Sequence, residues 1–396
     1  MVVLQINTLY KRGSTGKILA GIEHACDLQG IEHYAAFRYG GNMINDNHVF
    51  TVSSWLDCHV HNRLAHITGL QGSFSFIKTV LFLRKVSKIR PDIIHLHNIH
   101  GSYINHKLLF KYIQKNNIYL IWTLHDCWAF TGGCPHFEKI NCYKWKEKCG
   151  NCPLAKSNNQ LIDTSKYNLY KKRKLFSAVK NAIIVTPSFW LKKLASQTYL
   201  NKYQIRVINN GIDLNVFYPR GAIFRENHNL DEKYIILGVA FNWDHSKGLD
   251  VFIKLADILS SDYTIIMVGI NDSIKESLPD NIISIPRLEN QHELAKIYSS
   301  ADIFLNPTRE DTFPTVNIES LACGTPVLTF NTGGSPEVLD DKCGKIVPDD
   351  IDDIVATIMN IKEINPFSRE YCVNKAKRYD QDLLFTKYAE LYNDLV

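Results

Sequence analysis

The chain has 396 residues, of which 45% are hydrophobic and 21% are charged, and its formal net charge at pH 7 is +5. This length favours two domains, and the composition excludes an intrinsically disordered chain, which would be richer in charge and poorer in apolar residues. The net charge is too small for a chain of this length to indicate a nucleic-acid-binding protein. No apolar run is long enough to cross a bilayer and the first residues lack a secretion signal, so we expect a cytoplasmic protein.

In the first half, short β-rich runs alternate with stretches of helical periodicity; these runs are residues 2–7, 91–97, 119–125 and 181–187. The alternation predicts a parallel α/β sheet. After the first run comes the loop RGSTGK (12–17), where Gly13 and Gly16 would let backbone amides approach a phosphate or a sugar. The loop matches neither the P-loop pattern nor GxGxxG, which disfavours an ATPase or a dinucleotide enzyme.

Histidines gather where two of these strands end. His125 closes the run YLIWTLH, at the carboxyl edge of the predicted sheet, where open α/β folds place ligand sites. A lone histidine is usually structural, and this strand-end position is the feature that favours a functional role for His125. We expect His95, His97 and His100, which follow the run PDII, to serve an acceptor pocket or local folding and not to bind a catalytic metal.

A cysteine-rich insertion at 127–155 follows His125, and it carries Cys134, Cys142, Cys149 and Cys152. Four thiolates at this spacing fit a tetrahedral structural zinc site. A reduced loop without metal, a pair of disulfides and an iron–sulfur cluster are the alternatives, and a cytoplasmic location disfavours the disulfides. Because four thiolates leave no open coordination position, such a zinc would stiffen the loop beside the acceptor site and would not activate water.

Two stretches of the first half, 73–90 and 165–176, mix basic and apolar residues. Most such runs are solvated helix faces. The mixture also suits contact with an anionic membrane surface or with a lipid-diphosphate acceptor.

The second half repeats the α/β alternation, with β-rich runs at 234–241, 262–269, 281–286, 301–307 and 325–330. A second Rossmann-like sheet follows from this pattern. The turn residues Asn-Asn-Gly within 203–219 indicate the join. We therefore predict domains at 1–205 and 206–379, followed by a helix at 380–396 whose apolar face packs back on the first domain.

The stretch 309–336 carries the strongest chemical signal. A strand ending at Pro307 leads to a loop with Glu310 and Asp311, and a helix is expected to begin near Thr315. The unpaired N–H groups of such a helix end attract phosphate. Glu319 stands eight residues after Asp311, so one acid could hold a sugar and the other a ribose, because a carboxylate accepts two hydroxyl hydrogen bonds. The alternative is that Asp311 only caps the helix and Glu319 forms a surface ion pair.

Five ordered blocks resemble the retaining GT-B enzymes of glycosyltransferase family 4, namely residues 185–193, 207–219, 247–256, 294–338 and 344–350. The third and fourth blocks hold Lys247-Gly248 and the acid-x7-acid signature. The resemblance implies two Rossmann-like domains whose parallel sheets face each other across a cleft, with the nucleotide-sugar bound by the second. It also implies transfer without a catalytic metal, so we expect Asp350 and Asp352 to start a helix.

The resemblance also assigns roles to single residues. Asp311 and Glu319 would hold sugar and ribose hydroxyls, and the amides near Thr315 and Val316 would hold the diphosphate. Lys247 would be the cation on that diphosphate, with the loop of Gly13 and Gly16 facing it, and His125 would hydrogen-bond the transferred sugar.

Two positions depart from the family pattern. Asp311 stands where the family usually has Glu, with Glu310 beside it as a substitute, and Asn242 replaces an Arg that usually grips the diphosphate. Arg287 is a candidate for the base pocket, although arginines at strand ends more often form surface ion pairs.

The sequence therefore predicts a retaining glycosyltransferase that resembles the enzymes of bacterial capsule, O-antigen or colanic acid synthesis. We expect a UDP-sugar donor, with a GDP-sugar as the alternative, a lipid-linked polysaccharide or oligosaccharide acceptor, and peripheral contact with the inner membrane face. A GT-B nucleotide-sugar epimerase and a zinc-ribbon nucleic-acid-binding protein are the competing predictions.

Overall fold

The computed structural model describes residues 1–40, 46–156 and 160–395, and the chain divides into two compact α/β units. Unit 1 takes residues 1–209 and 384–396, and unit 2 takes residues 210–383. The predicted boundary at 205/206 lies four residues before the observed one, and the predicted start of the final segment, 380, lies four residues before Leu384. Among the described helices, none combines the length and the apolar character needed to cross a bilayer.

Unit 1 is built on a parallel sheet of seven strands in the order β3-β2-β1-β4-β5-β6-β7. The α/β prediction is confirmed. The sequence analysis found β1, β4, β5 and β6 but missed β2, β3 and β7, which form the two edges. The strands are β1 (Val2–Asn7), β2 (Glu32–Phe37), β3 (Val49–Thr51), β4 (Ile93–Leu96), β5 (Tyr119–Thr123), β6 (Ala182–Thr186) and β7 (Gln204–Val207).

Helices cover both faces of the unit 1 sheet because successive strand residues point to opposite sides. Helices α1 and α14 pack on Val3, Ile93 and Ile121, whereas α2 to α6 pack on the other side, around Leu4 and Ile94. The helices are α1 (Gly13–Leu28), α2 (Trp55–Thr68), α3 (Phe76–Ile89), α4 (His106–Lys115), α5 (Ser165–Phe176), α6 (Phe189–Ala195) and α14 (Gln381–Asn393), with a short 3-10 turn η4 (Tyr199–Lys202).

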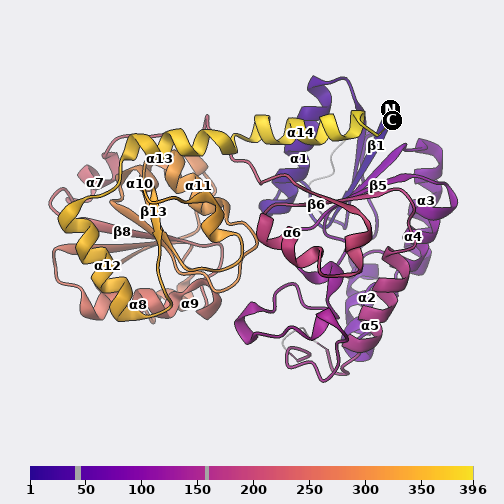
Figure 1. The fold of residues 1–396 in the computed structure, drawn as a ribbon, viewed down its shortest axis with the longest axis horizontal. Helices are drawn as coiled ribbons and strands as arrows, with labels where there is room; N and C mark the ends of the chain where they lie inside the picture. The colour runs from indigo at the N-terminus through magenta and orange to yellow at the C-terminus, as the bar shows by residue number, and fades with distance from the viewer. Residues whose placement is uncertain (41–45, 157–159, 396) are drawn as a thin grey trace. The chain divides into compact units, whose positions relative to one another are not determined.

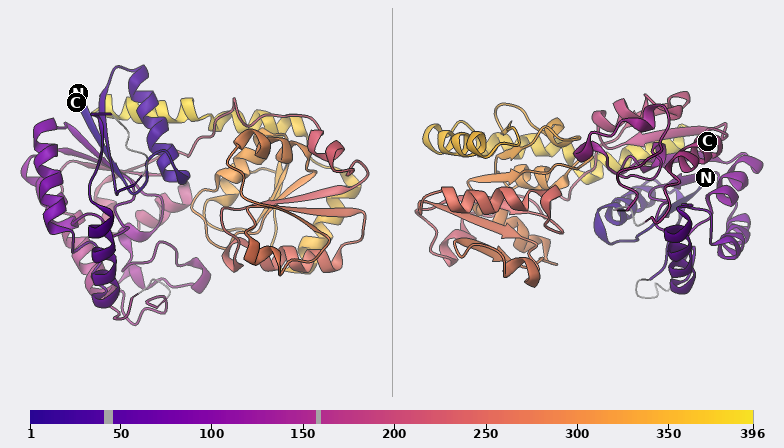
Figure 2. Two further views of the ribbon diagram at one scale, coloured as in Figure 1. Left: turned by 180° about the vertical axis from the view of Figure 1, so that it is seen from behind. Right: turned by 90° about the horizontal axis from the view of Figure 1, so that it is seen from below.

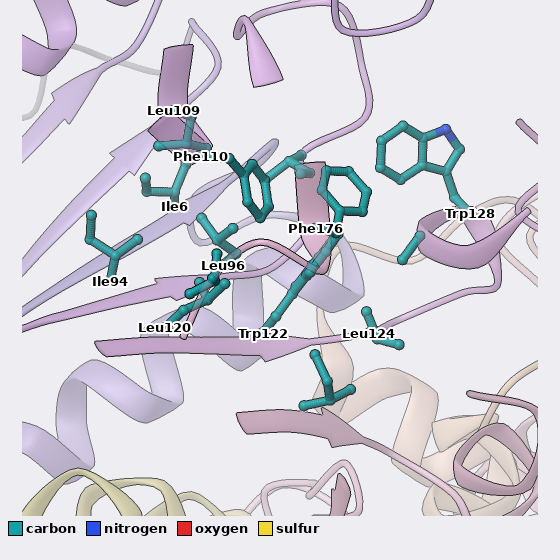
Figure 3. Close-up of a cluster of buried hydrophobic side chains, with 14 of the residues drawn as sticks. Ile6, Ile94, Leu96, Leu109, Phe110, Leu120, Trp122, Leu124, Trp128 and Phe176 are labelled. Atoms are coloured by element: carbon teal, nitrogen blue, oxygen red, sulfur yellow. The ribbon is translucent and has the colours of Figure 1, made fainter. Parts of the chain in front are cut away.

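The larger core of unit 1 is aromatic. Figure 3 shows Phe110 of α4 and Phe176 of α5 over Trp122 of β5. The ring of Phe176 lies 4.5 Å from that of Phe110 and 4.8 Å from that of Trp122, measured between centroids. This packing fixes α4 and α5 against the strand that leads to His125.

The cysteine-rich insertion contains only three short 3-10 turns, η1 (Trp128–Phe130), η2 (Glu138–Ile140) and η3 (Lys144–Lys146). Its buried aromatic residues, Trp128, Phe130, Phe137 and Trp145, join the larger core of unit 1. The loop is therefore anchored by side-chain packing and not by regular secondary structure.

The sequence suggested that the basic run of α5 is a solvated helix face, but part of this run is buried. Asn168, Leu169, Lys172 and Phe176 recur at helical spacing and form the buried stripe of this helix. Lys172 is only 4% exposed, and its ammonium donates to the carbonyls of Trp128 (2.7 Å) and Thr131 (3.2 Å). Burial lowers the pKa of Lys172 well below its ordinary value.

Unit 2 holds a parallel sheet of six strands in the order β10-β9-β8-β11-β12-β13. Helices α10, α11 and α13 pack on one face and α8 and α12 on the other (Figure 1, Figure 2). The strands are β8 (Tyr234–Val239), β9 (Tyr263–Val268), β10 (Ile282–Ile285), β11 (Ile303–Asn306), β12 (Val327–Thr329) and β13 (Gly344–Ile346). The helices are α7 (Ile223–Asn227), α8 (Leu249–Ile258), α9 (Asp272–Lys275), α10 (Gln291–Ser300), α11 (Thr315–Ala322), α12 (Ile351–Ile364) and α13 (Arg369–Ala376), with 3-10 turns η5 (His245–Lys247), η6 (Ser335–Val338) and η7 (Lys377–Tyr379).

Candidate active site

Strand β11 of unit 2 delivers the predicted acidic loop, and a lysine from the neighbouring β8–α8 connection meets it. The ammonium of Lys247 lies 2.9 Å from a carboxylate oxygen of Asp311. It also donates to the hydroxyl of Thr308 (3.3 Å) and to the carbonyl of Glu310 (3.2 Å). The structure therefore brings together Lys247, Glu310 and Asp311, which the sequence analysis had placed at one site, with Glu310 contributing its carbonyl.

Helix α11 begins at Thr315, where the sequence predicted a helix start. Its N-cap residue is Pro314, whose side chain makes no capping hydrogen bond. Thr315 and Val316 lie half-buried in the first turn. A helix end of this kind, which still has N–H groups to offer, is suited to an anion.

Glu319 lies in the second turn of α11. The hydroxyl of Tyr298, from α10, donates to its carboxylate at 3.3 Å. Tyr298 is fully buried, and burial raises the pKa of its hydroxyl well above the ordinary value, so the hydroxyl stays a donor. The sequence analysis missed Tyr298, because only the packing of α10 against α11 brings it to Glu319.

Arg309 is a second residue that the sequence analysis missed. Its guanidinium forms ion pairs with Asp250 (2.8 Å) and Asp349 (2.6 Å) and donates to the carbonyl of His245 (2.6 Å). These bonds fasten the acidic loop to the segment that carries Lys247. The sequence could have indicated Arg309, because this arginine directly precedes Glu310 and Asp311.

Two glycines allow the close packing of these loops. Gly333 has φ +56°, and a Cβ there would lie 1.6 Å from the carbonyl oxygen of Asp311. Gly248 has φ +77°, and its Cβ would lie 2.4 Å from Cγ of Pro307. A residue with a side chain at either position would be strained and would push the acidic loop aside.

Arg287 and Asn242 follow the carboxyl ends of β10 and β8. Asn242 is exposed, and the guanidinium carbon of Arg287 lies 4.0 Å from the ring centroid of Phe241. Arg287 also stands 3.9 Å from the carboxylate of Glu289. Phe241 is 62% exposed, so Arg287 shares this edge of the sheet with an aromatic face that the sequence analysis did not single out. Asp350 caps α12, as predicted, by accepting from the amides of Asp352 and Asp353.

Unit 1 contributes its own group of polar side chains around His125. The half-buried ring of His125 lies with Nε2 3.0 Å from Nδ1 of His97, and burial lowers its pKa to about 4. The next residue, Asp126, accepts from His100 at 2.8 Å and from the amide of Trp128 at 2.8 Å. Burial by itself would raise the pKa of Asp126, but His100 and these hydrogen bonds outweigh it and lower the pKa to about 2.

A cavity of about 200 Å³ adjoins this group, and its polar lining includes Asn62, His66, Gln71, His100 and Ser102. His100 therefore faces a pocket, whereas His95 and His97 are buried on the sheet. The glycines Gly13 and Gly16 form the first turn of α1, where Gly13 has φ +62° and the carbonyl of Gly16 accepts from the amide of Lys11.

The four clustered cysteines line one small cavity of about 20 Å³. The thiol of Cys134 donates a hydrogen bond to Cys152, which lowers the pKa of Cys152 to about 6. Across residues 1–40, 46–156 and 160–395, however, no three His, Cys, Asp or Glu side chains are drawn together closely enough to hold a metal ion. Zinc binding stays a prediction.

Comparison with known proteins agrees with this division of the chain. Residues 40–216 match the family Glycosyltransferase Family 4, and residues 222–379 match Glycosyl transferases group 1. Together the two matches leave only the termini and a short connection unmatched.

One curated relative comes from a bacterial cps region and another is named for colanic acid biosynthesis. A 41.2 kDa protein from the cps region of Klebsiella pneumoniae is 27% identical over 76% of this chain and 78% of its own length. The putative colanic acid biosynthesis glycosyl transferase WcaC of Escherichia coli K12 is 23% identical over 66% of this chain and 65% of its own length.

Among solved structures, Alr3699/HepE of Anabaena in complex with UDP and glucose matches with a TM-score of 0.69 and 14% identity, over 100% of both chains. This likeness concerns the fold. The chain therefore carries, in order on two Rossmann-like units, a Glycosyltransferase Family 4 domain and a Glycosyl transferases group 1 domain, and it is a glycosyltransferase of the GT-B fold.

Proposed function

We propose that this glycosyltransferase moves a sugar from a nucleotide-sugar to a lipid-linked saccharide with retention of configuration. The observation that carries the proposal is the Lys247–Asp311 pair beside the start of α11, the helix that also holds Glu319. A cation, a helix N-terminus and two hydroxyl-binding carboxylates are the groups that a nucleoside diphosphate sugar requires. The complex of HepE with UDP and glucose supports such a donor for this chain, and the name of WcaC supports polysaccharide synthesis.

In the proposed reaction, the bond between the sugar carbon and the diphosphate oxygen breaks while the acceptor oxygen bonds to the same face of that carbon. The departing diphosphate takes the acceptor proton. Lys247 and the amides of Thr315 and Val316 stabilise the charge that develops on the diphosphate. Asp311 exchanges its pairing with Lys247 for sugar hydroxyls, Glu319 holds the ribose, and His125 of unit 1 bonds a substrate hydroxyl.

The nucleotide base has a candidate platform at Phe241 and Arg287. An exposed ring with a guanidinium 4.0 Å from its centroid can stack a base and add charge to the contact. The Phe241 ring and the Arg287 guanidinium can each stack on either a pyrimidine or a purine base. A UDP-sugar therefore stays the first expectation and a GDP-sugar the alternative.

The test is the release of nucleoside diphosphate from a panel of nucleotide-sugars, with and without lipid-linked saccharides. We expect release that requires an acceptor, and we expect Glu319→Ala to lower kcat/KM about 10²-fold or more through the loss of charged hydrogen bonds. Glu363→Ala, which changes an exposed carboxylate of α12, is the matched control. Equal rates for Glu319→Ala and wild type would refute the assignment, and sugar conversion without diphosphate release would favour an epimerase.

Unit 1 also exposes apolar side chains along α2 and α3, and we call this set of side chains the α2–α3 surface. Leu56, Val60 and Leu64 recur every four residues on the side of α2 opposite the buried Cys58 and Ala65. The exposed apolar side chains of this surface are Trp55, Leu56, Val60, Leu64, Ile67, Phe76, Ile77 and Leu81.

The charges around this surface are almost all positive. Residues 55–90 contain one acid, Asp57, against Arg63, Lys78, Arg84, Lys85, Lys88 and Arg90. Apolar side chains next to unopposed basic residues are suited to an anionic bilayer. We therefore propose that the α2–α3 surface holds the enzyme at the membrane that carries its lipid-linked acceptor.

Co-sedimentation with vesicles tests this proposal. We expect binding to vesicles that contain anionic lipid, weakened by salt, and we expect Val60→Asp/Leu64→Asp to reduce partitioning about tenfold or more through lost apolar burial. Ile258→Asp places a similar charge on an exposed apolar position of unit 2 and should leave binding unchanged. Full binding by the α2 variant would contradict the proposal.

We propose, as the sequence indicated, that Cys134, Cys142, Cys149 and Cys152 bind a structural zinc. Their shared cavity supports the proposal, and zinc binding would draw the four thiolates closer together. Protein purified without added zinc should contain about one zinc per chain by elemental analysis. Cys149→Ser/Cys152→Ser should lose it, whereas Cys26→Ala, a buried thiol outside the cluster, should keep it. Equal metal in the cluster variant and the wild type would contradict the proposal.

A further inference from the structure

A row of buried polar side chains crosses the sheet of unit 1 beneath α1 and α14. Gln5 of β1 stands in register with His95 of β4, and Thr123 of β5 points to the same face. Gln5, His95 and Thr123 have no exposed surface, and His97 is 1% exposed. Polar groups buried this deeply must find hydrogen-bond partners, so their bonds determine where the protons lie.

The proton on His97 follows from the amide of Gln5. The Leu19 carbonyl of α1 lies 3.4 Å from Nε2 of Gln5, and because a carbonyl only accepts, the amide nitrogen faces it. The amide oxygen then faces Nε2 of His97 at 3.1 Å. Nε2 of His97 must therefore carry a proton.

The second ring nitrogen of His97 carries none. The groups packed around this ring are Gln5, His95 at 4.2 Å and His125 at 5.3 Å between centroids, and Trp122, whose indole N–H donates to the His97 carbonyl. These neighbours include no carboxylate, and the nearby Asp126 is bonded to His100. Burial lowers the pKa of His97 well below its ordinary value, so the ring is neutral. Its Nδ1 accepts from His125, 3.0 Å away, and the proton between them belongs to Nε2 of His125.

Hydrogen bonds from helix α14 hold His95 and Thr123 of this polar row in place. Nδ1 of His95 lies 2.6 Å from the hydroxyl of Tyr392, and Nε2 of His95 lies 2.8 Å from the hydroxyl of Thr123. Thr123 in turn donates to the hydroxyl of Tyr388 at 3.3 Å. The strand that leads to His125 is therefore fixed through Thr123 by Tyr388, which lies 265 positions away in the sequence.

We propose that Gln5 and His97 are positioning residues that hold His125 as its Nε2–H tautomer, so that Nδ1 accepts a hydrogen bond from a substrate hydroxyl. The proposal rests on the proposed function, because it gives His125 a substrate to contact. The bond made by one ring nitrogen of a histidine sets the role of the other, as in other sites where a histidine binds its ligand.

Nuclear magnetic resonance of the full-length protein, with nitrogen-15 in its histidines, reads the tautomer without any assay of activity. At neutral pH we expect a protonated Nε2 and an unprotonated Nδ1 for His125, with its signals assigned by their absence in His125→Asn. In His97→Leu, which has no acceptor for the Nε2 proton, the signals should shift toward a mixture of tautomers. A protonated Nδ1 on His125 in the wild type would overturn the proposal.

Kinetics then test whether the tautomer matters. His97→Leu should lower kcat about tenfold, the effect expected from one lost hydrogen bond, with little change in KM for the donor. His97→Gln offers an amide nitrogen to Gln5 and an oxygen to His125, so it should recover most of the loss. The control is His61→Leu, because His61 is equally buried in unit 1 but bonds Ser75.

The possible outcomes separate this proposal from the proposed function. If the His97→Leu variant is folded by circular dichroism and transfers sugar with the kcat of the wild type, the positioning role of His97 is overturned and the proposed function stands. A loss in His97→Gln as large as in His97→Leu would also overturn it. If the wild type binds no nucleotide-sugar in calorimetry, the proposed function fails and the role of His97 in transfer fails with it.

Discussion

Replacing Lys247 by alanine should lower kcat for sugar transfer by about 10²- to 10³-fold, the range seen when one preorganised group on a developing negative charge is removed. The sequence predicts Lys247 as the cation on the diphosphate, because Asn242 stands where the family pattern usually has an arginine. Its ammonium is already held by Asp311, Thr308 and the Glu310 carbonyl. The charge is therefore in place before the diphosphate arrives.

Steady-state kinetics with the donor varied at saturating acceptor provide the measurement. Lys254→Ala, an exposed lysine on α8 of the same unit, should behave as the wild type. Binding of the nucleoside diphosphate, measured by calorimetry, should also weaken in Lys247→Ala. A variant with wild-type kcat would show that the helix N-terminus stabilises the leaving group without the lysine.

Replacing Gly333 by alanine should cost about 3 kcal/mol or more of unfolding free energy, the sum of a strained positive φ and an overpacked contact. The new Cβ would lie 1.6 Å from the carbonyl oxygen of Asp311, a backbone atom that moves only with its loop. Because the displaced loop carries the Lys247–Asp311 pair, donor binding should fall together with stability. Urea unfolding and calorimetry with the nucleoside diphosphate measure the two effects.

Gly221 provides a matched control, because it separates the cost of a positive φ from the cost of the close contact. It also has a positive φ, +71°, but among the described residues no atom lies within 4 Å of its would-be Cβ. Gly221→Ala should cost about 1–2 kcal/mol, the backbone term alone, and should leave donor binding unchanged. Equal losses in the two variants would mean that the contact with Asp311 contributes nothing.

The strands that the sequence analysis missed all lie at or next to a sheet edge, although the edge strand β10 was predicted. Central strands such as β4 and β5 are buried on both faces and read as continuous apolar runs, which sequence periodicity detects. The missed strands β3, β7 and β13 lie at sheet edges, and β2 lies next to β3. These strands are short or partly exposed, so their apolar periodicity is weak. The exposed apolar stripe of α2 was missed for a related reason, since both faces of that helix carry apolar residues and no single face stands out.

The sequence by itself determined the two α/β units and the start of α11, because strand periodicity, turn chemistry and helix-start signals are local. The grouping of Lys247 with the acidic loop came from the resemblance to glycosyltransferase family 4. The sequence could not show that Lys172 is buried, that Tyr298 reaches Glu319, or that Arg309 fastens the acidic loop through Asp250 and Asp349. Those facts depend on which helix faces pack together. The row from Gln5 through His97 to His125 is the clearest case, because its residues are brought together by the order in which parallel strands pair, and hydrogen bonds between strands far apart in the chain leave no local trace in the sequence.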